Sequence, residues 1–216
     1  MGHVIVDLPA AGIDCLEALW QELLEHHLTA APHLAALGTP REPADSWRVR
    51  RAQYLRWLAS PTAAVLVARD ADRLLGYAMI RCADAAGSWQ WGDQVGTLET
   101  LVVADSARGT GVGRELLDAA RERLAEWGAE VLTISVIAGN EGAARFYRRE
   151  GASDYLRTLI MPVRQPLFTG RDPVSAQLAP PARRARGRGR QSTGSRDSSQ
   201  AAPVTHWASG RADSER

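Results

Sequence analysis

The sequence predicts an α/β fold in which one mixed sheet is flanked by helices. Short apolar, β-branched runs alternate with longer segments whose apolar residues recur at helical spacing. The chain has 216 residues, 45% of them hydrophobic and 24% charged. This length suits one well-buried domain and is too short for two ordinary ones. The predicted element order is β-α-α-β-β-β-α-β-α-β.

Six segments have the composition of strands. Residues 131–136 are β-branched and apolar, which is typical of a buried strand. Residues 63–68 and 74–81 are expected to pair as a hairpin across residues 69–73. The other predicted strands are residues 3–8, 96–103 and 155–161.

Four segments have helical spacing. Residues 13–28 carry a stripe of Leu and Trp, and residues 44–59 place these residues on one face: Trp47, Arg51, Tyr54, Leu55 and Leu58. A third helix follows a glycine-rich turn and ends at Gly128, where a C-terminal cap belongs. The fourth runs from Asn140 to Glu150 and is closed by Gly151.

Composition divides the chain near residue 164. Residues 1–164 form the predicted domain and are mildly acidic, which disfavours a nucleic-acid surface. Residues 165–216 are rich in Arg, Pro, Gly and Ser, and we expect a disordered tail. Its run RRARGRGR, residues 183–190, leaves contacts with nucleic acid as the less favoured alternative.

Other compositional features exclude several protein classes. The two cysteines, Cys15 and Cys82, lie far apart without a CxxC or Cys/His pattern, so neither a disulfide scaffold nor a metal site is expected. No apolar run reaches the roughly 20 residues that span a bilayer, and no signal peptide is recognisable. We therefore expect a cytoplasmic protein without membrane partners.

The sequence RGTGVG, Arg108 to Gly113, lies between a predicted strand and a predicted helix. Its glycines permit a tight turn and let backbone N–H groups approach a ligand, and a helix N-terminus favours phosphate. A P-loop is excluded because Arg114 stands where Lys is required. A dinucleotide fingerprint requires GxGxxG, whereas these glycines are spaced GxGxG. A turn for the pyrophosphate of an acyl-CoA remains, beside a turn that only connects two elements.

The segment LVVADSARGTGVGRELL resembles the signature of GNAT-superfamily N-acetyltransferases, Arg/Gln-x-x-Gly-x-Gly/Ala after a strand. Arg108, Gly111 and Gly113 match it in place. The segment NEGAARFYRREGA is similar to the second motif of that family, although Ala152 stands where the family usually carries Phe. The resemblance covers residues 4–161. It implies a mostly antiparallel GNAT-like sheet, acetyl-CoA as acyl donor without a metal, and an amine as acceptor.

The resemblance also implies which residues hold acetyl-CoA. Two parallel strands splay apart, and the pantetheine arm contacts the first strand at Leu101, Val102 and Val103. The N–H groups of the turn would bind the pyrophosphate; its residues are Arg108, Gly109, Thr110, Gly111, Val112, Gly113 and Arg114. Several convergent donors suit a dianionic group. Asn140 is expected to cap its helix and to contact the pantetheine arm.

Acyl transfer requires a base for the amine, a donor for the carbonyl oxygen and an acid for the thiolate. Glu99, a carboxylate within the apolar run TLETLVV, is the candidate base, acting directly or through water. A backbone N–H near Leu101 or Val102 would bind the carbonyl oxygen. The resemblance implies Tyr147 as the general acid, and an ordinary packing Tyr is its alternative. No covalent nucleophile is expected, so transfer would be direct within a ternary complex.

The acceptor is left open between a small amine and a protein amine, and a homodimer is possible. Asp93, His26, His27 and His33 are lesser candidates for the base. Aromatic residues of the first two helices and of the loop before residue 96 could line the acceptor pocket. The alternative to an enzyme is a catalytically idle acyl-CoA sensor that engages a partner through its basic tail.

Overall fold

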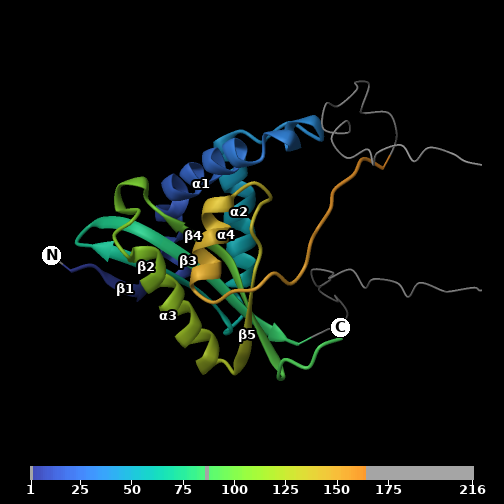
Figure 1. Ribbon diagram of the computed structural model, residues 1–216. Coiled ribbons are helices and arrows are strands. Elements are labelled where there is room, and N and C mark those ends of the chain that lie inside the picture. Colours follow the sequence, from blue (N-terminus) through green and yellow to red (C-terminus); the bar gives the residue numbers. More distant parts are fainter. Residues whose placement is uncertain (1, 86–87, 164–216) are drawn as a thin grey trace, which may run out of the picture. The chain divides into compact units, whose positions relative to one another are not determined.

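The computed structural model describes residues 2–85 and 88–163 (Figure 1). A short strand, β1 (Val4–Asp7), is followed by the 3-10 helix η1 (Ala10–Leu16), helix α1 (Glu17–Ala30), η2 (Pro32–Ala36) and helix α2 (Pro43–Trp57). Three strands come next: β2 (Ala63–Asp70), β3 (Arg73–Asp84) and β4 (Gln94–Val103). The chain continues through η3 (Asp105–Ala107), α3 (Val112–Glu126), β5 (Ala129–Ile134) and α4 (Glu141–Arg149).

The five strands form one sheet in sequence order, β1-β2-β3-β4-β5. The first four pair antiparallel, and only β4 and β5 run parallel, so the predicted mixed and mostly antiparallel sheet is confirmed. The parallel pair is the βαβ unit that carries the glycine-rich turn, since α3 connects β4 to β5.

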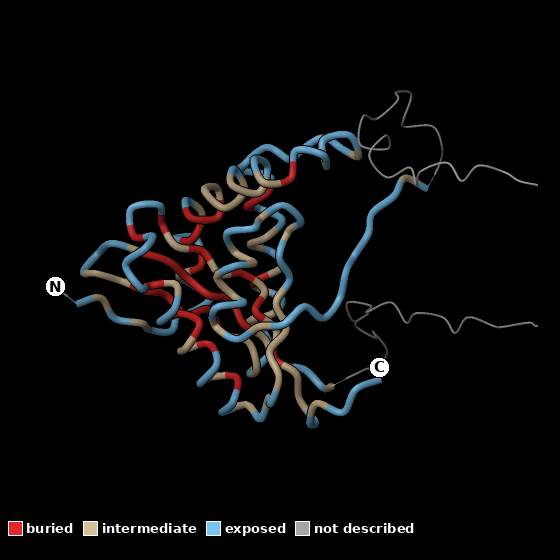
Figure 2. The backbone as a smooth tube through the Cα atoms, viewed as in Figure 1, coloured by how far each residue is buried: buried red, intermediate tan, exposed pale blue. Residues whose placement is uncertain are grey.

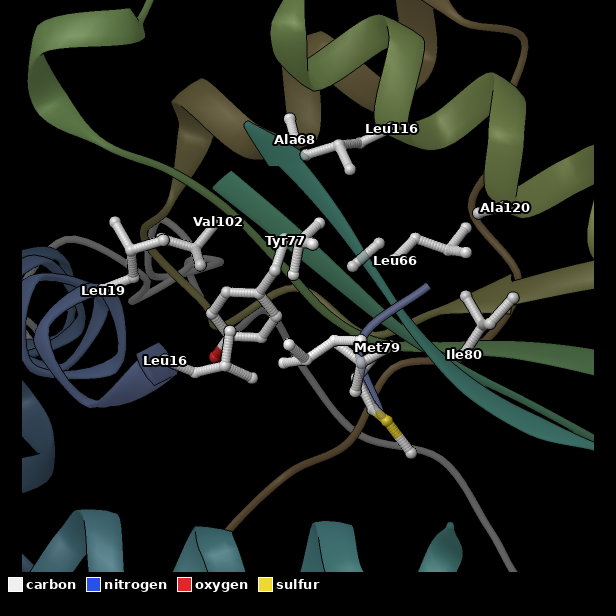
Figure 3. Close-up of a cluster of buried hydrophobic side chains, with 14 of the residues drawn as sticks. Leu16, Leu19, Leu66, Ala68, Tyr77, Met79, Ile80, Val102, Leu116 and Ala120 are labelled. Atoms are coloured by element: carbon white, nitrogen blue, oxygen red, sulfur yellow. The ribbon is translucent and has the colours of Figure 1, made fainter. Parts of the chain in front are cut away.

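Helices cover both faces of this sheet. In Figure 3, Leu116 and Ala120 of α3 lie on one side of the strands, and Leu16 and Leu19 lie on the other. Leu16, Tyr77 and Leu116 are all fully buried. The burial view shows the same arrangement, with buried backbone concentrated in the strands and the facing sides of the helices (Figure 2).

α4 lies on the α3 side of the sheet. The Arg121 guanidinium of α3 donates to the carbonyl of Glu150, and Arg114 forms an ion pair of 3.6 Å with the Glu150 carboxylate. The end of α4 is thereby tied to α3, next to the glycine-rich turn.

Glycine is required where two elements approach closely. A Cβ on Gly76 would lie 2.6 Å from the carbonyl oxygen of Val102 on the neighbouring strand. A Cβ on Gly139 would lie 2.1 Å from the carbonyl oxygen of Ala30, at the end of α1. Real Cβ atoms do not come this close to backbone, so the loop after β5 can touch α1 only through glycine.

The predicted strand at residues 155–161 is wrong. This segment forms no secondary structure and pairs with no other strand of the described chain. Its large apolar side chains are exposed, with Leu159 at 82%, and Figures 1 and 2 show it leaving the body of the domain. β-propensity was sufficient to suggest a strand, but a strand also needs a paired edge and a buried face, and this segment has neither.

The remaining boundaries shift by a few residues. The predicted helix at 13–28 divides into η1 and α1, and the strand predicted at 131–136 ends at Ile134. The predicted tail, residues 165–216, lies outside the described residues. In the described part of the chain no helix is both long and apolar enough to cross a bilayer.

Candidate active site

β4 and β5 separate halfway along β4. They pair only from Gln94 to Leu98, opposite Ala129 to Ile134. The second half of β4, Glu99 to Val103, pairs with β3 alone. Its backbone groups on the other edge therefore have no strand partner, and these are the residues at which we predicted the pantetheine contacts: Leu101, Val102 and Val103.

The glycine-rich turn follows directly from this open edge. Gly109 and Gly111 have φ of 77° and 99°, which non-glycine residues rarely adopt. Gly111 is the N-cap of α3, without a capping side chain. No hydrogen bond within the described residues uses the N–H groups of Gly109, Gly111, Val112 or Gly113. Four unpaired donors, three of them consecutive, thus stand at the N-terminus of a 15-residue helix.

The other predicted residues of the turn are engaged internally. The N–H groups of Arg108 and Thr110 donate to carbonyls at 3.3 and 3.4 Å, and that of Arg114 donates to Gly111 at 2.9 Å. The Arg108 side chain forms an ion pair of 2.7 Å with Asp105. Of the predicted set, the four donors named above are therefore the N–H groups without an acceptor in the described chain.

The second motif meets the turn through Phe146. A Cβ placed on Gly113 would lie 3.4 Å from Val103 and 3.9 Å from the ring of Phe146. The end of β4, the start of α3 and the middle of α4 therefore converge at Gly113. Tyr147 is next to Phe146, and the two rings lie edge to face at 5.1 Å. Burial raises the pKa of the Tyr147 phenol above its ordinary value, so the group stays protonated at neutral pH.

Asn140 caps α4 as predicted. Its side-chain oxygen accepts a hydrogen bond of 3.1 Å from the N–H of Ala143. The cap fixes the start of the helix that carries Tyr147.

Glu99 lies at a bulge in β4. Leu98 pairs with Ile80 and Thr100 with Met79, so Glu99 is the additional residue between two consecutive partners. Its Oε1 accepts a hydrogen bond of 2.7 Å from Nε of Arg81, and a terminal nitrogen of that guanidinium lies 2.5 Å from the same oxygen as an ion pair. Arg81 in turn stacks on Trp57 of α2, 4.8 Å from the ring centroid. The ion pair was not predicted, and within the described chain it leaves Oε2 without a hydrogen-bond donor.

A buried hydroxyl network joins α2 to the open half of β4. The Tyr54 hydroxyl lies 2.6 Å from that of Thr100 and 3.3 Å from that of Tyr77. Burial raises the pKa of both phenols, so the network is neutral. Tyr54 was predicted on this helix face, but Thr100 was not singled out, because a Thr in a strand carries no distinguishing signal.

The lesser candidates are scattered. His33 and Asp93 are exposed, and Trp47 is a core residue with 4% exposure. Trp91 packs against Tyr155 at 4.7 Å.

The two cysteines lie in different environments. Cys15 is exposed and Cys82 is buried, and burial raises the pKa of the Cys82 thiol. Among the described residues no group of His, Cys, Asp and Glu could hold a metal ion.

Comparison with known proteins agrees with this geometry. The model of the Acetyltransferase (GNAT) family matches residues 20–152. An uncharacterized N-acetyltransferase of Mycobacterium bovis is 31% identical over 100 residues, which are 46% of this chain and 59% of that protein. The mycothiol acetyltransferase of Propionibacterium freudenreichii is 35% identical over 127 residues, 58% of this chain and 39% of that protein. The chain thus covers less than two thirds of the length of these curated relatives.

Solved structures share the fold. AAC(6')-Iy, an aminoglycoside N-acetyltransferase solved with the bisubstrate analog CoA-S-monomethyl-acetylneamine, superposes with a TM-score of 0.57 at 16% identity. The match covers 76% of this chain and 100% of that one. Because the family model covers more than half of the sequence, the chain belongs to the GNAT acetyltransferase family.

Proposed function

We propose that this protein transfers the acetyl group of acetyl-CoA to a primary amine. The observation that carries the proposal is the continuity between the open half of β4 and the four free N–H groups of the turn. The pantetheine arm of acetyl-CoA carries amides that need backbone partners along a strand edge. The pyrophosphate at its end needs several convergent N–H donors next to that edge. The pair of positive-φ glycines keeps Cβ atoms out of the turn.

Acetyl-CoA supplies an activated thioester, and the residues of this chain fit it without a metal. Val102 is 4% exposed, and Leu101 and Val103 are half-buried, so bound acetyl-CoA would complete the cover over the open edge of β4. A backbone N–H at Leu101 or Val102 would then bind the thioester carbonyl oxygen away from bulk water, where such a hydrogen bond is stronger. The same exclusion of water would favour the neutral form of an amine.

Proton transfer is assigned to the two predicted residues. An alkylamine has a pKa near 10, so it reaches the site protonated. Oε2 of Glu99, which the Arg81 pair leaves available, accepts that proton directly or through water. The nitrogen then attacks the carbonyl carbon, and the C–N bond forms as the C–S bond breaks. Tyr147 protonates the departing sulfur, and the second proton that the nitrogen loses on becoming an amide passes through water to restore the Tyr147 hydroxyl.

The positions of the two cysteines favour direct transfer of the acetyl group to the amine over an acetyl-cysteine intermediate. Burial holds Cys82 as a neutral thiol, and Cys15 lies in η1, outside the converging elements at Gly113. A thiol nucleophile would have to be a thiolate. We therefore assign a ternary complex without a covalent intermediate.

The test measures release of CoA thiol from acetyl-CoA in the presence of a panel of amines, after binding of acetyl-CoA has been confirmed calorimetrically. We expect turnover that depends on the amine and yields a stoichiometric N-acetyl product by mass spectrometry. Equal thiol release with and without amine would show hydrolysis instead. Binding without turnover on small amines and on peptides with free amino groups would contradict the proposal and support an acyl-CoA sensor.

A further inference from the structure

Two basic side chains interrupt the apolar stripes with which α1 and α2 face each other. Along α1, His27 follows the buried Trp20 and the half-buried Leu23 at helical spacing, and it is itself half-buried. Along α2, Arg50 lies between the buried residues Trp47 and Tyr54 and is half-buried as well. Charged or ionisable side chains are costly at such positions unless they have a partner.

Arg50 has no acidic partner in the described chain, whereas its neighbours on α2 do. Arg48 pairs with Asp45 at 2.8 Å, and Arg51 pairs with both carboxylate oxygens of Asp14. The Arg50 guanidinium instead lies over two aromatic rings, 4.5 Å from the centroid of Trp20 and 5.7 Å from that of Tyr54. Stacking on aromatic rings uses the flat faces of a guanidinium, so the N–H groups in its plane can still donate to an acceptor.

The surroundings of His27 are also basic. Burial lowers the pKa of His27, and the charges of His26 and Arg50 lower it further. Glu22 of the same helix accepts a hydrogen bond of 3.4 Å from the N–H of Asp105. This corner of the molecule thus favours an anion and disfavours a further cation.

The basic corner adjoins the open half of β4. Tyr54, on which Arg50 stacks, reaches Thr100 of that half at 2.6 Å. On the other side, Ala30 at the end of α1 touches Gly139 of the loop that follows β5. α1 therefore runs from β4 to the loop after β5, and His27 lies one turn before that contact.

We infer that Arg50 and His27 form an anion subsite that binds a carboxylate or phosphate group carried by the acceptor amine. This inference rests on the proposed function and deepens it, because it names the acceptor class as amines that also bear an acidic group. The forked guanidinium binds such a group with two parallel hydrogen bonds, and the imidazole adds a third donor. Polycationic acceptors are correspondingly poor substrates.

The experiment compares acceptors that differ only in the acidic group. ω-Amino acids of two to six carbons are assayed against the alkylamines of the same length, and phosphoethanolamine is assayed against ethanolamine. We expect at least one acidic member to exceed its neutral counterpart in kcat/KM about 10- to 100-fold, the range for charge-assisted hydrogen bonds. The carboxylate and phosphate series decide which anion is bound.

Substitutions of arginines on α2 test whether Arg50 causes the preference for acidic amines. Arg50→Gln should lower the ratio of kcat/KM for the acidic amine to kcat/KM for its neutral counterpart to about one, and Arg50→Lys should restore part of that ratio. Arg48→Gln, which alters an exposed and paired arginine of the same helix, should leave the preference unchanged. Equal preference in wild type and Arg50→Gln would overturn the inference, provided that the variant melts as the wild type does.

A second readout does not depend on turnover. The ring protons of His27, assigned with a His27→Gln variant, are followed by NMR during titration with a 6-aminohexanoate and with hexylamine in the presence of CoA. Bound carboxylate should raise the pKa of His27, whereas hexylamine should not. If no amine is acetylated, the proposed function fails and this titration still decides the subsite: no difference between the two ligands would refute it.

Discussion

The open half of β4 is surrounded by backbone groups on one face of the sheet and by side chains on the other. On the α3 side, the turn offers backbone N–H groups held by glycines with positive φ. On the α1 and α2 side, the contacts are made by side chains from distant segments: Glu99 with Arg81, Tyr54 with Thr100, and Arg50 with Trp20. Backbone donors suit a donor molecule that never changes, and side chains can be exchanged without disturbing the fold. This difference explains why the family motif includes the residues on the α3 side and none of the side chains on the α1 and α2 side.

The backbone side should be the more sensitive to a single change. Gly111→Asp adds a Cβ at φ of 99°, which costs about 1–2 kcal/mol, and a carboxylate that opposes the pyrophosphate. We expect affinity for acetyl-CoA to fall on the order of 100-fold or more by calorimetry. Gly128→Asp is the matched control, because Gly128 also has positive φ but has open space around it. Equal loss in both variants would show strain alone and contradict the assignment of the turn.

Tyr147→Phe tests the acid at the junction of the two sides. We expect kcat to fall about 100-fold, while the KM for acetyl-CoA changes less than about twofold, since only a proton donor is removed. Tyr155→Phe, at an exposed tyrosine, is the control.

The pH dependence sharpens this test. Burial raises the pKa of Tyr147, so the acid form persists to higher pH than for a free phenol. The wild-type kcat should therefore not decline between about pH 7 and pH 9 through ionisation of this group. Unchanged kcat in the Phe variant would remove Tyr147 from the acid role.

A smaller effect is expected on the side-chain face at Glu99. Glu99→Gln should lower kcat/KM for the amine about tenfold at pH 7, with unchanged affinity for acetyl-CoA. The deficit should shrink as the pH rises towards the pKa of the amine, near 10, because the substrate then arrives neutral. Glu130→Gln, at the exposed residue of β5, serves as the control. A deficit independent of pH would assign Glu99 a structural role with Arg81.

The smallest effect concerns stability. Tyr54→Phe removes the hydroxyl that contacts Thr100 and Tyr77 and should lower the free energy of unfolding by about 1 kcal/mol. Urea denaturation measures it, with Tyr155→Phe as the exposed comparison. No change would indicate that the two remaining hydroxyls satisfy each other.

Features that depend on local sequence could be predicted. The turn follows from the spacing of Gly109, Gly111 and Gly113, and the first two have a positive φ that other residues rarely adopt. The cap at Asn140 follows from a short side chain ahead of a helix. The separation of β4 from β5 was implied by the family resemblance and is confirmed by their register.

Features that depend on strand register or on packing between distant segments could not be predicted from the sequence. The Glu99–Arg81 pair joins residues 18 positions apart across a bulge that shifts one strand against the other. Arg50 and Arg51 are equivalent in a helical pattern, and only the position of Asp14 in η1 decides which of them is paired. The segment 155–161 was predicted as a strand because composition cannot show that an edge to pair with is missing.

Binding of CoA along β4 and at the turn can be measured by backbone amide NMR shifts and hydrogen exchange on addition of CoA. We expect the largest shifts and new protection at Gly109, Gly111, Val112 and Gly113, with a second group at Leu101 to Val103. Arg50 and His27 should change little until an acidic amine is added. Protection centred on other elements, with the turn unaffected, would contradict the account.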